Sequence, residues 1–292
     1  MAFAGFPTVC WRCFLSAGSK RSENMERKVK TIGLLRFSVL TPTYYSERFK
    51  TLEETAAHIF SPERMDLRFN IFEKLCLPSL VRQTDPGFDM VVLTADSMPP
   101  VYLERLLDLL DPYDNIHCLP VGTDNHYKLL QKGYNAVPVE DCTHRILFRL
   151  DDDDALDRNF IKRTKRLANG LLKLQGGRAP FIIAYNRGFY VRSTGPEVEI
   201  FDACERAPLS TGTALVGPVG NNVNPYRFNH RKLAQHFNTY SDISVPSFVR
   251  TIHGDNKSNP AQMGITHKMT LDAIDAQLQE HFEMSIDDLR AL

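Results

Sequence analysis

The stretch RILFRLDDDDALDRNF, residues 145–160, places an apolar run directly before four consecutive aspartates and then resumes with helix-forming residues. The apolar run predicts a buried strand, and the residues after the aspartates predict a helix. Repulsion between neighbouring carboxylates grows where protein excludes water, so these aspartates need water, a helix N-terminus or a cation nearby. The stretch therefore predicts a strand followed by a helix, with a charged site where the strand ends.

The segments around this stretch alternate between strand and helix patterns. Strands are predicted at residues 31–40, 88–96, 115–121 and 144–150, and helices at residues 62–83, 99–111 and 157–174. Ser61 and Pro62 predict the start of the first helix, and Gly176 and Gly177 the end of the last; residues 125–137 are less regular. This alternation predicts a largely parallel sheet covered on both faces.

The second half of the chain has a different pattern. We predict a β-hairpin or meander at residues 178–203, with the turn STGP, and a loop-rich stretch at 210–225. A short helix at 230–237, a late strand at 245–252 and an amphipathic helix at 270–292 follow. The predicted fold class is α/β with a mixed, mostly parallel sheet. Residues 1–28, which contain the CxxC pair of Cys10 and Cys13, are expected to be a poorly ordered extension, and residues 29–292 one domain.

Composition excludes several classes of protein. Lysine plus arginine equals aspartate plus glutamate at 35 each among 292 residues, so no basic field attracts nucleic acid. No run reaches the ~20 apolar residues of a membrane-spanning helix, although peripheral contact with a membrane stays open. The six cysteines are too scattered for a disulfide framework, which favours reduced thiols. The chain reads as an ordinary globular protein.

The aspartate cluster has three possible interpretations. Asp154 or Asp157 can cap the following helix while the other carboxylates are solvated. An EF-hand loop starting at Asp151 is excluded, because its sixth position is Leu156 and its twelfth is Lys162. The third interpretation is a short carboxylate cluster that holds Mg²⁺ or Mn²⁺, with phosphate oxygens and water completing the coordination. Its position at the carboxyl end of a strand favours this third interpretation.

Four segments together resemble a known family. RFSVL at residues 36–40, the long segment from Pro62 to Pro100, LFRLDDDDAL at residues 147–156 and HGDNKSN at residues 253–259 are similar to the putative rhamnosyltransferase family of bacterial GT-A-type glycosyltransferases. The resemblance covers roughly residues 30–260. It implies a GT-A-like, Rossmann-type fold, with a nucleotide-sugar half at about 29–160 and an acceptor half at about 161–292. It also implies Mn²⁺ or Mg²⁺, a nucleotide-sugar donor such as dTDP-rhamnose, a glycan or other hydroxyl acceptor, and a cytoplasmic setting.

The resemblance assigns roles within the aspartate cluster. It implies that Asp153 binds the cation directly and that Asp151 contacts the nucleotide or sugar and lies beside the metal, with Asp152 as a further donor-binding carboxylate. A cation that bridges the two phosphates of a leaving nucleoside diphosphate stabilises the charge that develops as the glycosidic bond breaks. Arg36, at the end of the first strand, can contact phosphate or serve as an ion-pair partner. Asp96 can contact the base or ribose, or cap the turn that follows it.

Other candidate residues lie in the second half. His253 can supply an imidazole to the metal or a hydrogen bond to the diphosphate, with Asn256 and Ser258 as further donor contacts. An inverting transferase also needs a base for the acceptor hydroxyl, and Asp202, Glu205 and Asp242 are the candidates among which the sequence does not choose.

Two other functions remain open at this point. A catalytically silent module of the same fold would bind nucleotide or divalent cation without turnover. A nucleotidyltransferase would use the same kind of carboxylate-bound metal but release pyrophosphate instead of a nucleoside diphosphate. The sugar-transferring enzyme is the favoured hypothesis.

Overall fold

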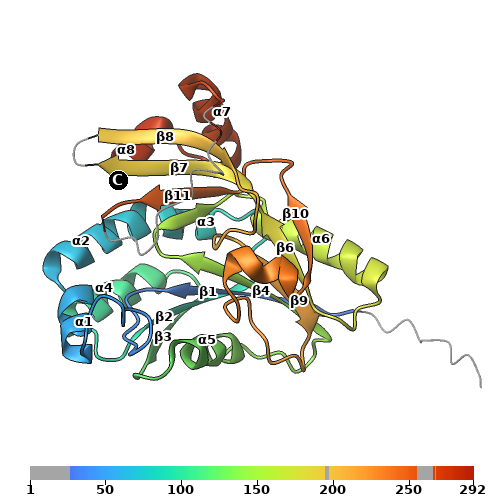
Figure 1. Cartoon of the computed structure of the whole chain (residues 1–292), viewed down its shortest axis with the longest axis horizontal. Helices are drawn as coiled ribbons and strands as arrows, with labels where there is room; N and C mark the ends of the chain where they lie inside the picture. The colour runs from blue at the N-terminus through green and yellow to red at the C-terminus, as the bar shows by residue number, and fades with distance from the viewer. Residues whose placement is uncertain (1–26, 195–196, 255–265, 267) are drawn as a thin grey trace, which may run out of the picture.

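The computed structural model describes residues 27–194, 197–254, 266 and 268–292, and Figure 1 shows their arrangement. Expectations for residues 1–26, including the CxxC pair, lie outside these residues. The main sheet has seven strands in the order β10-β6-β9-β4-β1-β2-β3. In chain order their bounds are β1 Val29–Arg36, β2 Asp89–Ala95, β3 Ile116–Val121, β4 His144–Asp151, β6 Phe181–Tyr185, β9 Ala214–Pro218 and β10 Asn238–Asp242. All pairings are parallel except the two that β9 makes, which confirms the predicted mixed, mostly parallel sheet.

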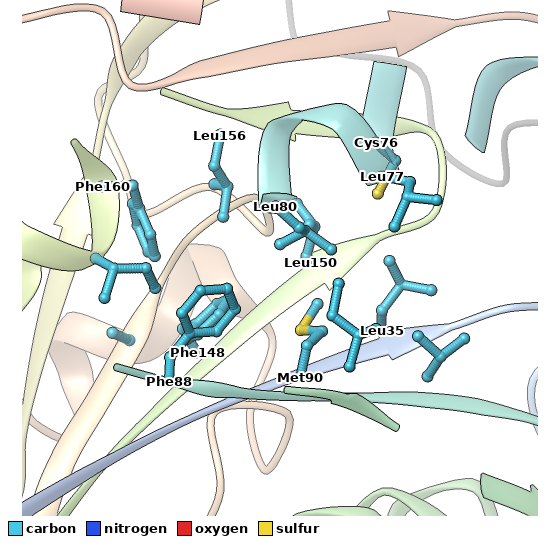
Figure 2. Packing of buried hydrophobic residues seen from close by; sticks show 14 of the residues in the cluster. Leu35, Cys76, Leu77, Leu80, Phe88, Met90, Phe148, Leu150, Leu156 and Phe160 are labelled. Carbon is cyan, nitrogen blue, oxygen red and sulfur yellow. The ribbon is translucent and has the colours of Figure 1, made fainter. Parts of the chain in front are cut away.

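Helices cover both faces of this sheet. On one face α2 (Pro62–Ile71), α3 (Leu77–Val81), α4 (Pro100–Leu110) and α6 (Phe160–Gln175) enclose the largest buried cluster. Figure 2 shows Phe148 and Leu150 of β4 in this cluster, near Leu80 and Phe160. On the other face α5 (His126–Asn135) packs against alternate residues of β1, β2 and β4. Because β4 and β1 are covered on both sides, they form the centre of the domain.

A second sheet of four strands lies beside the first and carries the C-terminal helices. Its order is β5-β11-β7-β8, with bounds Asp154–Leu156, Phe248–Ile252, Arg187–Thr194 and Glu197–Cys204. β7 and β8 form the predicted antiparallel hairpin. One face of this sheet packs on α7 (Leu271–Phe282) and α8 (Ile286–Arg290); in Figure 1, α7 is at the top of the view and α8 lies behind β8. β5 contains Asp154, so this sheet begins inside the aspartate cluster.

The helix predicted at residues 62–83 is interrupted. It starts as predicted, with Ser61 as N-cap and Pro62 in the first turn. A π-helical turn, η1 (Phe72–Cys76), then separates α2 from α3. Pro78 has no N–H to bond the carbonyl of Lys74, which explains why the regular hydrogen-bond pattern fails at this point. A shorter α1 (Leu52–Ile59) precedes α2.

The less regular segments contain elements that the sequence patterns left unassigned or assigned wrongly. Residues 126–135, which were left unassigned, form α5, because Leu129, Leu130 and Tyr134 recur at helical spacing and Asn125 caps the helix. The stretch at residues 210–225, predicted to be loop, contains β9. β6 does not continue into the hairpin of β7 and β8 but pairs with β9 and β10 in the main sheet. In these segments the strand partners are distant in sequence, so local patterns carry little signal.

The amphipathic helix predicted at the C-terminus is divided in two. The division comes at Glu283, whose backbone adopts a left-handed conformation with φ of 55°. Ser285 then starts α8 with a capping box that it forms with Asp288. The turn lets Leu278 of α7 and Leu289 of α8 pack into one buried cluster. The short helix predicted at residues 230–237 is the 3₁₀ helix η2 (His230–Gln235).

Two glycines should respond to alanine substitution in opposite directions. At Gly188 in β7, an added Cβ would lie 2.4 Å from the backbone oxygen of Phe248 in β11. Gly188→Ala must push two central strands apart, and we expect a loss of about 1–3 kcal/mol of unfolding free energy. At Gly170 in α6, an added Cβ meets no atom within 4 Å, so Gly170→Ala should gain roughly 0.5–1 kcal/mol. Urea titrations of both variants check the prediction, which equal effects would contradict.

Candidate functional site

The carboxyl ends of β1 and β4 bring Arg36 and Asp151 together. The two residues face each other in the strand register, and their side chains form an ion pair. Arg36 also lies over the rings of Tyr44 and Tyr226, with its guanidinium carbon 4.8 Å and 5.3 Å from the ring centroids. Burial opposes ionisation of Asp151, but Arg36 and Arg149 outweigh it and lower the pKa of this carboxyl. Asp151 is therefore held as a carboxylate at the strand end.

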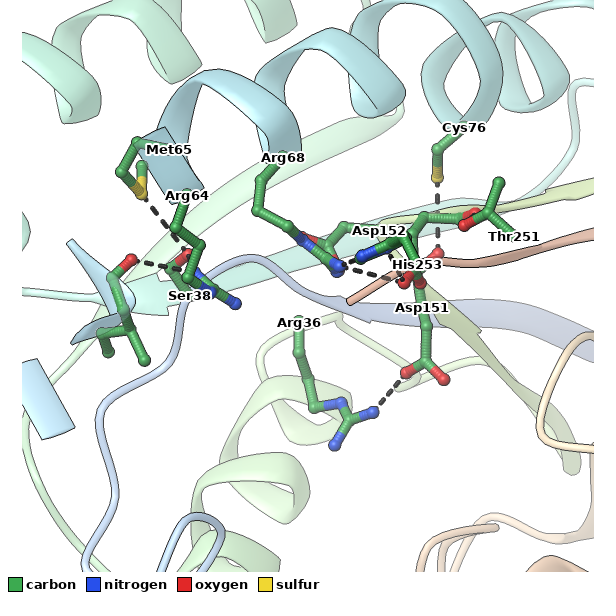
Figure 3. Close-up of polar contacts among 12 residues, drawn as sticks. Arg36, Ser38, Arg64, Met65, Arg68, Cys76, Asp151, Asp152, Thr251 and His253 are labelled. Carbon is green, nitrogen blue, oxygen red and sulfur yellow. Dashed lines mark hydrogen bonds and ion pairs between the residues drawn. The ribbon is translucent and has the colours of Figure 1, made fainter. Parts of the chain in front are cut away.

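Arg68 of α2 binds the next two aspartates. Its Nε donates to Asp152 Oδ2 at 2.9 Å, a second nitrogen pairs with Asp152 Oδ1, and its Nη1 donates to Asp153 Oδ2 at 2.9 Å. All three side chains are at least nine-tenths buried. Figure 3 shows Arg68 reaching from α2 toward the acids, opposite Arg36. The bidentate pair with Asp152 is the strong geometry for an arginine and a carboxylate.

His253 returns to the same cluster, as its position after the late strand predicted. Its Nε2 lies 3.1 Å from Asp153 Oδ2 and 3.4 Å from Arg68 Nη1. The loop is fixed because β11 pairs with β5 and because the Thr251 hydroxyl donates to the carbonyl of Asp153 at 2.8 Å. Burial opposes the charge of Asp153, but Arg68 and His253 outweigh it and hold the pKa of this carboxyl well below its usual range.

The remaining acids of the motif do not cap α6, so that expectation was wrong. Asp154 is buried and accepts a hydrogen bond from the Thr211 hydroxyl, while burial and the neighbouring Asp153 raise its pKa well above the usual value. Asp157 accepts from the backbone N–H of Asn159, the N-cap residue, and forms an ion pair with Arg163. These two acids are internal, and only the first three face the site.

The sequence analysis missed the arginines that offset the acids. It found no basic cluster beside the aspartates in sequence, whereas the structure brings Arg68 to them from α2 and places Arg149 and Arg250 beside them. A signal was present in the predicted helix at residues 62–83. Arg64 and Arg68 lie four residues apart among its apolar positions, and both are buried. Charged residues on the buried stripe of a helix require polar partners inside the protein.

Other predicted donor contacts are not joined to this cluster. Asp96 is exposed in the turn after β2. Its carboxylate lies beside Gly122, with Oδ2 3.3 Å from the position that a Cβ would occupy on that glycine. Asn256 and Ser258 lie outside the described residues.

The three candidate bases are each held by other groups. Asp202 of β8 accepts from the backbone N–H groups of Lys268 and Met269 at 2.9 Å and 3.0 Å. Asp242 of β10 pairs with Arg163, with its Oδ2 3.3 Å from Nε. Among the described residues, the Glu205 side chain accepts one hydrogen bond, from the Tyr190 hydroxyl at 2.7 Å.

Asp153 and His253 are the two side chains of the cluster that could both bind a cation. Their Oδ2 and Nε2 atoms are 3.1 Å apart, a hydrogen-bond distance, and Arg68 donates to the same Oδ2, so a cation would have to replace these contacts. Among the residues that the structure describes, no group of three or more His, Cys, Asp or Glu side chains could hold a metal ion. With these two side chains alone, a cation would need a bound phosphate group and water to complete its coordination.

Comparison with known proteins identifies a family for most of the chain. The family model described as "Putative rhamnosyl transferase" matches residues 30–265. No curated protein sequence matches the chain.

The solved structures that match this chain are only distantly similar to it. A match to Staphylococcus aureus TarS residues 1–349 in complex with UDP has a TM-score of 0.40 and 11% identity, and covers 76% of this chain and 60% of that one. A second match is to a Bacillus anthracis protein described as a putative glucose-1-phosphate thymidylyltransferase in complex with sucrose. It has a TM-score of 0.36 and 8% identity, and covers 75% of this chain and 89% of that one. Similarities this low carry no argument about function. In the described residues, no helix is long and apolar enough to cross a membrane.

Proposed function

The chain belongs to the family described as "Putative rhamnosyl transferase", and from this membership we propose that it is a glycosyltransferase that moves a sugar from a nucleotide-sugar donor to a hydroxyl acceptor. The finer proposal is that the donor carries rhamnose, as in dTDP-rhamnose, that the acceptor hydroxyl belongs to a glycan and that the setting is cytoplasmic. The four described cysteines are free thiols, which supports a reducing compartment.

The observation that carries this proposal is the cluster at the end of β4. Three carboxylates, two arginines and one imidazole from four separate segments meet where ligands bind in open α/β sheets. Asp151 and Asp153 both have lowered pKa values, so they are ionised at neutral pH. A protein that only needed a stable core would not gather these groups, because burying charge costs free energy even when the charges are paired.

The chemistry follows from the charge of the leaving group. A nucleoside diphosphate leaves with concentrated negative charge, which the site must stabilise most as the glycosidic bond breaks. When bound between Asp153 and His253, Mn²⁺ or Mg²⁺ would supply a Lewis acid for the phosphates. Arg36 and Arg68 hold the carboxylates in place and add positive charge at the same edge. Because both oxygens of Asp152 are bound by Arg68, its part in donor binding is to position that arginine.

Glu205 is the residue that we propose as the general base. Asp202 is bound by two backbone N–H groups and Asp242 by Arg163, which stabilises both as structural carboxylates. Glu205 accepts from Tyr190, and Tyr190 faces Arg250 across the strand pair of β7 and β11. A carboxylate with one such hydrogen bond keeps an oxygen for the acceptor hydroxyl.

Product analysis tests the proposed function. The protein is incubated with UDP-, GDP- and dTDP-sugars and Mn²⁺, and released nucleotide is separated by ion-exchange chromatography. We expect a nucleoside diphosphate from one donor, at least through slow hydrolysis when no acceptor is added. Binding without release would identify a silent module, and pyrophosphate as product would identify a nucleotidyltransferase.

His253 should influence the choice of metal. Because an imidazole nitrogen favours Mn²⁺ over Mg²⁺, His253→Ala should weaken nucleoside diphosphate binding about 10-fold or more in Mn²⁺ and less in Mg²⁺. Isothermal titration calorimetry in each metal provides the measurement. His236→Ala is the matched control, since His236 is exposed and stacks on Phe228. Equal behaviour of the two histidine variants would remove His253 from the proposed site.

A further inference from the structure

The outer face of α6 carries a row of basic side chains. Lys162, Arg166 and Lys173 are all exposed, and Figure 1 shows the helix at the right of the view, on the outside of the main sheet. Lys162 and Arg166 are about one turn apart and Lys173 lies about two turns further along, so the three side chains share one face of the helix. This outer row therefore places positive charge along the length of α6.

More positive charge lies at the C-terminal end of α6. Arg178 is exposed shortly after the helix ends at Gln175. Arg27 is exposed too, and its Nε is 3.7 Å from the position that a Cβ would occupy on Gly177. Both arginines therefore lie next to the end of the outer row.

Acidic residues do not balance this charge locally. The whole chain has 35 basic and 35 acidic residues, but no aspartate or glutamate occurs between Asp157 and Glu197. Arg163 and Lys165 of α6 pair with acids, and they lie beside the outer row rather than in it. The side chains of the outer row form no ion pair with any residue that the structure describes.

Leu174 projects from the same end of α6. Its side chain is 80% exposed, more than any other large apolar side chain in the described part of the chain. Leu174 follows Arg163 by about three turns, so it lies on the side of α6 toward β10, whose Asp242 pairs with Arg163. Tyr240, two residues before Asp242 on the same face of β10, is also exposed. An apolar side chain and an aromatic ring therefore stand beside the basic row.

We propose that the α6 surface, formed by Lys162, Arg166, Lys173, Leu174 and Arg178, binds the anionic headgroups of a lipid bilayer. This inference goes beyond the proposed function and does not depend on it. Basic residues near an anionic bilayer each strengthen binding, and a helix with a basic outer face and a protruding apolar residue can lie in the plane of the headgroups. The aliphatic stems of the lysines and arginines would then lie along the bilayer while Leu174 enters its edge.

The exposed leucine favours a bilayer over other polyanions. A nucleic acid is held mainly by contacts between phosphates and basic side chains, and it gains nothing from an exposed leucine. The headgroup region of a bilayer accepts both kinds of side chain. Exposed acids such as Glu104 and Asp108 of α4 and Glu280 of α7 lie on other elements, and salt screens their repulsion over about 8 Å.

A bilayer on the α6 surface would leave the aspartate cluster uncovered. α6 begins shortly after Asp157 and runs back along the sheet for 16 residues, or about 24 Å. Its far end lies at the start of β4, where His144 Nε2 is 2.8 Å from the carbonyl oxygen of Gly177. Because the outer row faces away from the sheet, the bilayer would touch the side of the domain, and the strand ends that hold the candidate site would stay open.

Vesicle sedimentation with the full chain tests the α6 surface. The protein is mixed with vesicles of equal parts phosphatidylglycerol and phosphatidylcholine, or of phosphatidylcholine alone, and the bound fraction is measured after centrifugation. We expect at least about 10-fold tighter binding to the anionic vesicles, which should weaken as added salt screens the charges. The assay needs no donor, metal or turnover, so a failure of the proposed glycosyltransferase activity would leave its result unchanged.

Matched pairs of substitutions locate the contact. Lys162→Gln combined with Arg166→Gln should weaken binding to the anionic vesicles about 25-fold, since each basic residue at the bilayer contributes roughly fivefold. Lys128→Gln combined with Lys132→Gln is the control, because it removes two exposed charges with the same spacing from α5. The control pair should change binding less than about twofold.

A tryptophan in place of Leu174 reports insertion. Leu174→Trp should shift the fluorescence emission to shorter wavelength when anionic vesicles are added, because the indole ring enters a less polar region. Val101→Trp is the control, since Val101 is 66% exposed on α4, and its spectrum should not respond. The unmodified chain, which contains Trp11, gives the background signal.

Four results would overturn the proposal. The first is equal binding of anionic and neutral vesicles, and the second is an equal loss in the α5 and α6 pairs. Tighter binding of a short DNA duplex than of anionic vesicles would assign the α6 surface to nucleic acid. A dimer in sedimentation equilibrium that Leu174→Gln converts to a monomer would assign it to a second copy of the chain.

Discussion

Asp153→Asn is expected to reduce sugar transfer by about 100- to 1,000-fold, the usual loss when one charged group at a reacting centre is removed. Asp153 is the carboxylate that meets both Arg68 and His253, so its charge organises the two other groups. An amide in its place keeps the shape but offers one neutral oxygen and an N–H group, which repels a cation and Arg68 alike. Release of nucleoside diphosphate from the donor measures the loss.

The fold should survive this change with reduced stability. The sequence analysis treated the aspartate cluster as a solvated loop or metal site, but the Asp153 side chain is 7% exposed and lies in an ion-pair network. Because its folded-state pKa is depressed, its charge contributes stability above the unfolded pKa, and the amide loses that contribution at neutral pH. Asp108→Asn, on the exposed side of α4, is the control for activity and melting temperature.

Two results would contradict this prediction. One is turnover in Asp153→Asn close to that of Asp108→Asn, which would remove the carboxylate from the reaction. The other concerns the cation alone: full activity of the unmodified protein in excess chelator would show that Arg36 and Arg68 suffice to hold the diphosphate.

Arg163→Met should cause the largest loss of stability, about 3–5 kcal/mol at neutral pH. Arg163 donates from Nη1 and Nη2 to the two oxygens of Asp157, at 3.0 Å and 2.6 Å, and from Nη2 to Ser247 Oγ at 2.8 Å. Asp157 is completely buried, so the variant leaves a carboxylate in the core without its partner. Urea titration of the variant and of Arg166→Met, an exposed position on the same helix, gives the difference.

The deficit should depend on pH in a defined direction. Burial raises the pKa of Asp157 even though Arg163 opposes it, and loss of Arg163 raises this pKa further. When the folded-state pKa of a carboxyl group is raised, the folded protein binds the proton more tightly than the unfolded chain does. Its contribution to the unfolding free energy is then fully present below the unfolded pKa and is lost as pH rises through the folded pKa. The deficit of Arg163→Met should therefore be smaller near pH 5 than near pH 8.

A second substitution separates charge from packing. Asp157→Asn combined with Arg163→Met removes the charge of Asp157 while an amide oxygen still accepts from the N–H of Asn159, and it leaves Asp242, the second carboxylate beside Arg163, unchanged. The double variant should recover part of the loss at pH 8 and show less pH dependence than Arg163→Met. A deficit that is the same at both pH values, or that the double variant does not reduce, would mean that packing against the Tyr185 ring causes the effect.

Sequence patterns predicted those elements whose burial follows one local period. β1, β2, β3 and β4 are short apolar runs, and α4 and α6 repeat apolar residues at helical spacing, so their positions follow from local patterning. β9 and β6 were misassigned because their place depends on pairing with β4 and with each other, across long stretches of chain. The same limit applies to α5, which its buried face identifies more clearly than its residue propensities.

Local patterns were enough to predict that carboxylates lie at the end of a buried strand and that a histidine follows a later strand, because both features depend on apolar runs and the residues that end them. Which cations contact these groups depends on how distant segments pack against one another. Arg68 reaches Asp152 across 84 residues, and His253 reaches Asp153 across 100. The partner of a charged residue cannot be predicted from the sequence. The attraction between two ions depends on their distance and burial, and the pairing of the strands sets both of these.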